Sequence, residues 1–371
     1  MSEQSAVSER SAPWRRAGPS WPPAASGSGR LITGAYALLV LAVAIDLLTG
    51  PGSTTSPVLA AVPVLAGART RNVRVPLLAG ALATIGVGLL ALANPDVALP
   101  VHVAALVAVV AVTLASIANV VVVGAREREL LQVRTVAEAA QRALLRPPPD
   151  RLGPLRIAVR YAAAAAEARI GGDLYSVLDT PYGARILLGD VQGKGLAAVE
   201  TAADVLGVFR EAARSEPDLA VVAERLDSAL ARRPANERFV TAVLLNLPTG
   251  SGPGTLVNCG HPPPLLRRAH RVEELAPPEP APPLALRALT GGHYQARPVE
   301  LDPGDLLLLY TDGISEARDA AGRFYPLAAR LAAAPQREAG AVLDHLLADV
   351  AAYAPGGLTD DAALLAVGRP S

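Results

Sequence analysis

The stretch GDVQGKG, residues 189–195, follows the apolar run Ile186–Leu188 and contains the only lysine of the chain, Lys194. An acid, three glycines and a lysine in one loop after a strand-like run indicate phosphate chemistry. The glycines let the backbone come close to bound ions. Asp190 is therefore the best candidate for a bridging metal ligand, with the carbonyl oxygen of Val191 as a further ligand. Lys194 either meets a substrate phosphate or is simply solvated.

Three further aspartate sites stand at the edges of apolar, strand-like runs. These are Asp173 in IGGDLY (170–175), Asp312 in LYTDG (309–313), and Asp360 or Asp361 in TDD (359–361). Strand ends are rigid, so carboxylates that are far apart in the sequence can converge on one position. Carboxylate and carbonyl oxygens suit Mg²⁺ or Mn²⁺, whereas zinc fits this chain poorly.

We therefore predict a centre for two divalent ions, which together can clamp a phosphoryl oxygen and activate a water. Its metal ligands are Asp173, Asp190, Val191, Asp312 and one of Asp360 and Asp361, and Asp190 and Asp312 are its catalytic residues. Two neighbouring polar residues are assigned structural roles. His261, in NCGHPPP (258–264), is expected to stabilise a turn rather than to catalyse, and Glu316 to start a helix.

The composition of the 371-residue chain indicates a catalytic domain joined to a membrane region. Hydrophobic residues make up 51% and aromatic residues only 4%, so the apolar content is Ala, Leu and Val rather than one large core. The formal net charge is zero, which does not favour nucleic acid as a partner. The single cysteine, Cys259, excludes an intramolecular disulfide, and Leu265 stands where a cysteine-nucleophile phosphatase loop needs Arg.

Four apolar stretches precede the acidic motifs, at residues 31–48, 53–68, 75–93 and 98–124. A helix needs about 20 residues to span a bilayer. The second stretch is short and holds Pro57 and Pro63, so a re-entrant or tilted segment is an alternative there. Basic residues flank only one side of the stretches, which places both termini in the cytoplasm. The polar residues Asp46 and His102 are expected near the interfaces.

These patterns divide the chain into four parts: a disordered tail (1–29), a transmembrane region of about four helices (30–124), a linker helix (125–149) and a catalytic domain (150–371). Apolar residues at three-four spacing make the linker amphipathic, so it could pair with its copy in a homodimer. Pro147 and the two prolines after it end the linker.

The catalytic domain mixes strands and helices without strict alternation, which favours α+β layers over a doubly wound parallel sheet. The expected strands are 157–161, 186–188, 239–247, 256–259, 306–310 and 364–367. The expected helices are 196–214, 219–233 and 339–353, and the Pro-rich stretch 276–283 is expected to be a surface loop.

Taken in order, these segments resemble the PPM-type, metal-dependent protein serine/threonine phosphatases (protein phosphatase 2C superfamily), in the bacterial subgroup typified by sporulation stage II protein E. The resemblance covers about residues 140–367 and includes QRALL (141–145), FVTA (239–242) and PGD (303–305). It implies an α-β-β-α sandwich with two Mn²⁺ or Mg²⁺ ions held by Asp173, Asp190, Asp312 and Asp360. The chain departs from the family at Ser176, where another Asp is common, and at 192–194, where the eukaryotic branch has a histidine acid.

The sequence thus predicts a multi-pass membrane phosphatase with a cytoplasmic catalytic domain, acting on phosphoserine or phosphothreonine of a protein partner. By family analogy that partner is a phosphorylated anti-anti-sigma factor. A catalytically inactive pseudo-phosphatase that binds a phosphoprotein is the alternative. A diguanylate cyclase, prompted by the GGD of residues 171–173, is disfavoured because Leu174 follows Asp173 and because Asp190 and Asp312 would have no role.

Overall fold

The structure is a computed structural model that describes residues 27–50, 52–162, 171–232, 238–250 and 252–370. Its internal contacts divide the described chain into two compact units, with the boundary between Gln132 and Val133. The predicted tail, residues 1–29, lies outside the described residues up to position 26, and a helix begins at Gly27.

The first unit is helical. It contains α1 (Gly27–Thr49), the 3₁₀ helix η1 (Ser56–Ala60), α2 (Ala61–Gly67), α3 (Arg74–Ala93) and the first part of α4 (Leu99–Leu144). In the part of the chain that is described, three helices, α1, α3 and α4, are long and apolar enough to cross a membrane. The second apolar stretch instead forms η1 and the seven-residue α2, with a proline in the first turn of η1.

Small residues let the helices of this unit approach closely. A Cβ atom on Gly80 would lie 2.3 Å from the Thr113 hydroxyl oxygen, and one on Gly67 would lie 2.2 Å from the Ser116 hydroxyl oxygen. That Ser116 hydroxyl donates a hydrogen bond to the Pro63 carbonyl at 2.9 Å. Large apolar side chains such as Leu48 and Leu92 face outward, as expected of helices that meet lipid.

Asp46 is fully buried in this unit at the end of α1. Its carboxylate accepts hydrogen bonds from the Thr54 hydroxyl at 2.9 Å, from the backbone N–H and hydroxyl of Thr55, and from the Asn94 side chain. His102 is also buried, and neither ring nitrogen has a hydrogen-bond partner among the described residues. A position for either residue near a membrane interface stays a prediction.

Two antiparallel sheets form the centre of the second unit. One has the strand order β1 (Arg151–Leu152), β2 (Leu155–Ala162), β11 (Ala362–Gly368), β10 (Leu306–Tyr310), β7 (Leu265–Arg268) and β8 (Arg271–Glu274). The other has the order β3 (Leu174–Thr180), β4 (Gly183–Val191), β5 (Val240–Leu247), β6 (Gly254–Cys259) and β9 (Ala296–Val299).

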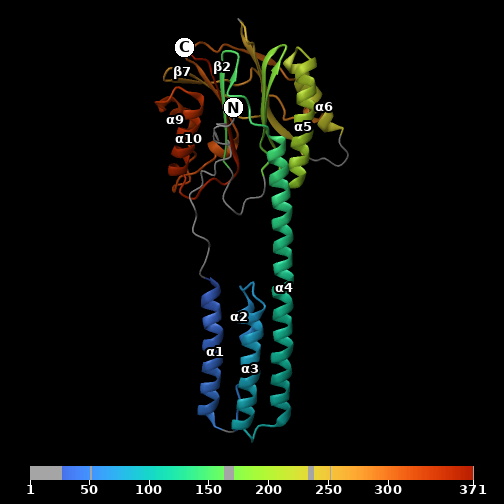
Figure 1. Ribbon diagram of the computed structural model, residues 1–371, viewed down its shortest axis with the longest axis vertical. Coiled ribbons are helices and arrows are strands. Elements are labelled where there is room, and N and C mark those ends of the chain that lie inside the picture. The colour runs from blue at the N-terminus through green and yellow to red at the C-terminus, as the bar shows by residue number, and fades with distance from the viewer. Residues whose placement is uncertain (1–26, 51, 163–170, 233–237, 251, 371) are drawn as a thin grey trace, which may run out of the picture. The chain divides into compact units, whose positions relative to one another are not determined.

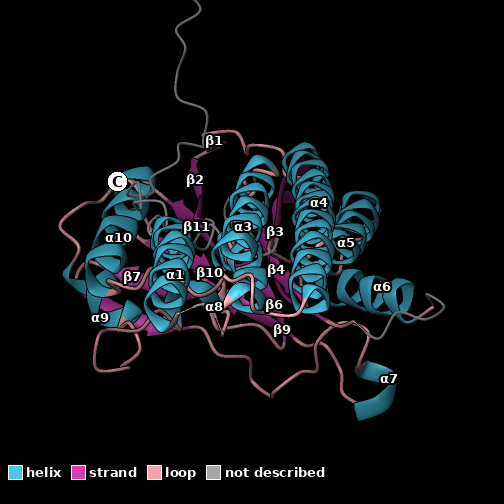
Figure 2. Cartoon of the chain, turned by 90° about the horizontal axis from the view of Figure 1, so that it is seen from below, coloured by secondary structure: helices cyan, strands magenta, loops and turns pink. Residues whose placement is uncertain are grey.

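Helices cover the outer face of each sheet, which gives an α-β-β-α sandwich (Figures 1 and 2). The helices α5 (Leu196–Ser215) and α6 (Leu219–Ala231) pack on the β3-containing sheet, and α9 (Leu327–Ala333) and α10 (Ala339–Tyr353) on the β2-containing sheet. Two short helices, α7 (Arg287–Thr290) and α8 (Asp312–Ser315), complete the unit. The predicted α+β sandwich is therefore confirmed.

The side chains of the β2-containing sheet alternate between its two faces, which explains how one sheet packs against both the other sheet and the helices. In β10, Leu307 and Leu309 belong to the core shared with the other sheet, whereas Leu306 and Leu308 belong to the core under α9 and α10. Successive side chains of a strand point to opposite faces, so one apolar run can supply both cores. Because both faces are covered, the run is buried without interruption.

The predicted strands and helices of this unit are present, most of them longer than expected. The predicted helix 219–233 ends at Ala231, and Arg233 lies outside the described residues. The predicted linker helix is the last part of α4, which continues without a break to Leu144. The strands β1, β3, β7, β8 and β9 were not predicted.

Asp218 caps the N-terminus of α6, since its carboxylate accepts a hydrogen bond from the Ala220 amide at 2.8 Å. Replacing an N-cap aspartate by alanine leaves that amide without a protein partner and typically costs about 1 kcal/mol. We expect Asp218→Ala to lower the free energy of unfolding by about that amount. Chemical denaturation of both proteins measures it. An unchanged midpoint would show that the cap contributes nothing.

Candidate active site

The first half of the site lies at one edge of the β3-containing sheet. Leu174 pairs with Gly189 in the antiparallel ladder between β3 and β4, so Asp173 and Asp190 are brought opposite each other. Their carboxyl groups are close enough for Asp190 to repel the ionised form of Asp173. Asp173 is buried, whereas Asp190 is partly exposed.

The second half lies at the corresponding edge of the β2-containing sheet. Asp312 follows β10, and Asp360 and Asp361 precede β11, which pairs with β10 in antiparallel fashion. The Thr311 amide donates to the Ala363 carbonyl at 3.0 Å and the Ala363 amide to the Thr311 hydroxyl at 2.8 Å. The pairing therefore holds these aspartates together at one end of the two neighbouring strands.

A side-chain hydrogen bond joins the two halves. The Thr311 hydroxyl donates to an Asp173 carboxylate oxygen at 2.9 Å, with both groups buried. Glycine makes further close approaches possible, because a Cβ on Gly172 would lie 2.3 Å from the Val191 carbonyl oxygen. A Cβ on Gly313 would lie 1.9 Å from the Asp361 carbonyl oxygen. All four predicted acidic segments thus meet at one end of the sandwich.

At this end of the sandwich, several carboxyl groups lie close together and partly buried, so their ionised forms are unfavourable unless a cation is bound. Burial, and then repulsion by Asp190, raises the pKa of the Asp173 carboxyl well above its usual range. Burial, and then repulsion by Asp312 and Asp360, raises the pKa of Asp190 to about 7. Burial also raises the pKa of Asp312, with Glu316 and Asp360 adding to it. A bound cation would reverse these shifts, because it favours the ionised form of each carboxyl group.

The acidic side chains lie near one another, but they are not arranged around one position as the ligands of a metal ion would be. Among the described residues, no three His, Cys, Asp or Glu side chains converge on one ion-sized position. Instead the Lys194 ammonium lies 2.6 Å from an Asp360 carboxylate oxygen, and these side chains are 30% and 47% exposed. Asp361 is buried and accepts a hydrogen bond from the Tyr161 hydroxyl at 2.9 Å. The available oxygen donors still match the preference of Mg²⁺ and Mn²⁺.

A family model described as Stage II sporulation protein E (SpoIIE) matches residues 180–370, more than half of the chain. The chain belongs to the SpoIIE family. Its second unit is accordingly a phosphatase domain of the protein phosphatase 2C type, as the sequence resemblance implied.

Solved structures with the same fold include the PP2C domain of SiaA from Pseudomonas aeruginosa. It is 19% identical, with a TM-score of 0.54, and the match covers 66% of this chain and 97% of that one. The RsbU and RsbW domains of a Mycobacterium tuberculosis protein are 28% identical, with a TM-score of 0.48 and coverage of 58% and 60%. A Bacillus subtilis SpoIIE fragment, comprising the phosphatase domain and part of the regulatory domain, is 18% identical, with a TM-score of 0.49 and coverage of 58% and 63%. The match thus spans about three fifths of the last two chains.

In this member of the SpoIIE family, His261 connects the two sheets. Its Nε2 lies 3.0 Å from the Tyr310 carbonyl oxygen, and its Nδ1 lies 3.0 Å from the Thr241 hydroxyl. A carbonyl only accepts, so Nε2 carries the proton and Nδ1 accepts from Thr241. The Asn258 side chain closes the turn, accepting from the His261 amide and donating to its carbonyl, both at 2.8 Å. These contacts support the predicted structural role.

Burial lowers the pKa of His261 to about 4, although the hydrogen bond to Tyr310 opposes the shift. The unfolded chain takes up this proton near pH 6.5. The contribution of His261 to the free energy of unfolding is therefore fully present above about pH 6.5. About 3 kcal/mol of it is lost as the pH falls to about 4. We expect thermal unfolding of His261→Asn to depend less steeply on pH in this window than that of the unsubstituted protein. Equal slopes would contradict the prediction.

Three residues of the site had no role assigned from the sequence. Thr311 orients Asp173, and Tyr161 donates to Asp361. The Gln141 amide, near the end of α4, donates to the Tyr161 oxygen at 3.1 Å and to the Gly171 carbonyl at 3.3 Å. Thr311 and Gln141 lie in motifs noted above, but their contacts reach 138 and 30 residues along the chain, which no local pattern indicates.

Proposed function

We propose that the chain is a membrane-anchored, metal-dependent phosphatase that removes phosphate from serine or threonine of a protein partner. The reaction breaks the bond between phosphorus and the side-chain oxygen and transfers the phosphoryl group to water. One observation carries the proposal: Asp173, Asp190, Asp312 and Asp360, from segments as much as 187 residues apart, meet where the Thr311–Asp173 hydrogen bond joins the sheets.

The fit of the residues to divalent metal supports this function. Asp173, Asp190, Asp312, Asp360 and the Val191 carbonyl would hold two Mg²⁺ or Mn²⁺ ions. Such ions, when bound, supply a nucleophilic water at neutral pH and neutralise phosphoryl oxygens. Thr311 keeps Asp173 in place by donating to one of its oxygens. Lys194, on the adjacent glycine loop, can turn from Asp360 towards a substrate phosphate when a cation replaces it at the carboxylate.

The membrane assignment rests on the three long apolar helices and on the outward-facing leucines and valines. The basic residues that flank the apolar stretches support a cytoplasmic position for the catalytic unit. Membership of the SpoIIE family supports a phosphorylated anti-anti-sigma factor as the partner.

The proposal is tested with the full-length chain in detergent or lipid nanodiscs. Phosphate release is measured from a serine-phosphorylated anti-anti-sigma protein, with Mn²⁺ and then with EDTA. We expect release only with the metal. An enzyme that shows no turnover with Mn²⁺ or Mg²⁺, or an equal rate in EDTA, contradicts the proposal.

The Lys194–Asp360 ion pair favours a second candidate, a pseudo-phosphatase that binds a phosphoprotein without hydrolysing it. In that case the lysine permanently occupies a carboxylate that a metal would need. Isothermal titration calorimetry separates the two candidates. Binding of the phosphorylated partner without any Mn²⁺ binding would favour the pseudo-phosphatase, and Mn²⁺ binding would favour the enzyme.

A further inference from the structure

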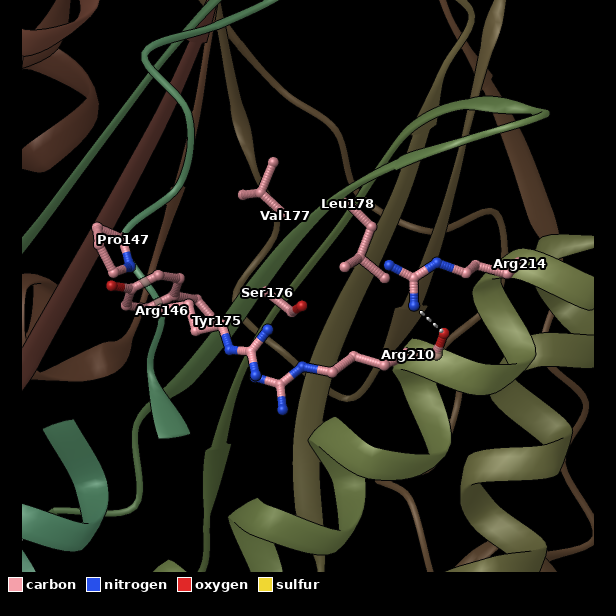
Figure 3. A pocket seen from close by; sticks show the side chains of 8 residues that line it. All are labelled: Arg146, Pro147, Tyr175, Ser176, Val177, Leu178, Arg210 and Arg214. Atoms are coloured by element: carbon pink, nitrogen blue, oxygen red, sulfur yellow. Dashed lines mark hydrogen bonds between the residues drawn. The ribbon is translucent and has the colours of Figure 1, made fainter. Parts of the chain in front are cut away.

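A cavity lies in the catalytic unit, where the segment after α4 meets β3 and α5 (Figure 3). Its volume is about 90 Å³. Three arginines line it: Arg146 just after α4, and Arg210 and Arg214 one turn apart on α5. Tyr175 and Ser176 of β3 form part of the wall. None of these residues belongs to the predicted metal site.

The positive charge of this arginine pocket is not compensated. Among the described residues, none of the three arginines forms an ion pair with an acid. Arg210 donates to the Leu144 carbonyl at 2.8 Å and Arg214 to the Arg210 carbonyl at 3.3 Å, and both acceptors are neutral. Burial lowers the pKa of Arg210, and repulsion by Arg146 and Arg214 lowers it further.

Several other arginines of the same unit have carboxylate partners, whereas the buried Arg185 and Arg267 donate to neutral oxygens. Arg160 lies 2.6 Å from Asp344, Arg268 lies 3.0 Å from Asp305, and Arg287 lies 3.3 Å from Asp227. What sets this place apart is that three guanidinium groups line one cavity without an acid, which leaves a local excess of positive charge. Like charges held together in a partly buried place lower stability unless an anion joins them.

We propose that the arginine pocket binds a phosphate-type oxyanion. A guanidinium group offers parallel N–H donors whose geometry matches the oxygens of phosphate. The cavity is well below the roughly 300–1,000 Å³ of sites that enclose drug-sized ligands. It therefore suits a single phosphate group and not an enclosed nucleotide. The group is either free inorganic phosphate or the phosphoryl group of a phosphoprotein.

Such a ligand would bridge Arg146, which follows the linker part of α4, to Arg210 and Arg214 on α5. It would replace three repulsive contacts by charge-assisted hydrogen bonds, each of which is stronger than a neutral one. The unit should therefore be more stable with the anion bound, in proportion to the logarithm of its concentration at saturation.

The test uses the full-length protein in detergent with EDTA, so that no metal can bring phosphate to the predicted catalytic site. Inorganic phosphate is titrated at constant ionic strength while the thermal midpoint is followed. We expect a saturable rise of the midpoint. Arg214→Gln and Arg146→Gln should each weaken the apparent affinity at least tenfold, which corresponds to the loss of one charged hydrogen bond.

Arg232→Gln is the matched control, because it removes the same charge from an exposed arginine just after α6, outside the pocket. It should titrate like the unsubstituted protein. Arg146 is exposed and lies beyond the end of α4, so its substitution leaves helix packing intact even if Arg214→Gln were to disturb α5.

A second arm uses N-acetyl-phosphoserine amide to identify the source of the group. A stronger pocket-dependent effect of this probe than of inorganic phosphate indicates a protein-borne phosphoryl group, and the reverse order indicates free phosphate. The proposal is overturned if neither probe raises the midpoint, or if both act equally on the unsubstituted protein, Arg146→Gln and Arg232→Gln. Because metal is absent throughout, this result does not depend on phosphatase activity.

Discussion

Asp190→Asn is expected to reduce phosphate release by about 10³-fold or more, since metal ions contribute several kcal/mol to catalysis and each 1.36 kcal/mol is a factor of ten. The substitution keeps the size of the side chain but removes the negative charge that would hold the metal ions. Asp190 stands near the end of β4, where the backbone is held by the ladders with β3 and β5, so its neighbours keep their positions. Steady-state release from a phosphoserine protein at saturating Mn²⁺ measures the effect.

Asp179→Asn is the control for this substitution. Asp179 lies on the neighbouring strand β3, is exposed, and stands near the end of that strand opposite to the acidic cluster. It should retain nearly full activity. If Asp190→Asn were as active as Asp179→Asn, the convergence of the four aspartates would have no catalytic meaning.

Asp227→Ala is expected to lower the free energy of unfolding by about 3–5 kcal/mol, as for other broken buried ion pairs. Asp227 is 3% exposed on α6. It accepts hydrogen bonds from the Ala285 amide at 2.9 Å, from the Tyr294 hydroxyl at 3.2 Å and from the Arg287 guanidinium at 3.3 Å. One carboxylate thus holds the chain that follows the Pro-rich loop, including Ala285 at a φ of 78°.

Denaturant titration of Asp227→Ala and Asp227→Asn tests this role. Asparagine can still accept hydrogen bonds through one oxygen, so we expect an intermediate loss for it. The Asp218→Ala substitution on the same helix provides the scale, because it removes a single exposed cap. A loss for Asp227→Ala no larger than that of Asp218→Ala would show that the buried network is not needed.

Much of the sandwich could be predicted because its central strands are continuous apolar runs. The run 306–310 is buried on both faces, so its apolar composition alone identifies it as a buried strand. The strand β3 was missed because its sequence, LYSVLDT, neither alternates strictly nor stays apolar. In β7, Leu265 and Leu266 are followed by two arginines, and the strand forms only because β10 and β8 pair with it.

The candidate site, like the fold, could be predicted from the sequence only in part. Acids at strand ends could be recognised locally, but which of them meet depends on strand register. The neighbours Asp360 and Asp361 illustrate this limit, since one pairs with Lys194 and the other accepts from Tyr161, 200 residues away. The arginine pocket was not predictable, because Arg146 and Arg210 are brought together by packing and not by any motif.

The rarity of lysine has a practical consequence. Thirty-three of the 34 basic residues are arginine, so the glycine loop carries the only side-chain amine in the chain. A lysine-specific endoproteinase has a single cleavage point, between Lys194 and Gly195, and an amine-reactive dye has a single side-chain target. Either reagent would report directly on whether the Lys194 ammonium is engaged by Asp360 or released, without any engineered label.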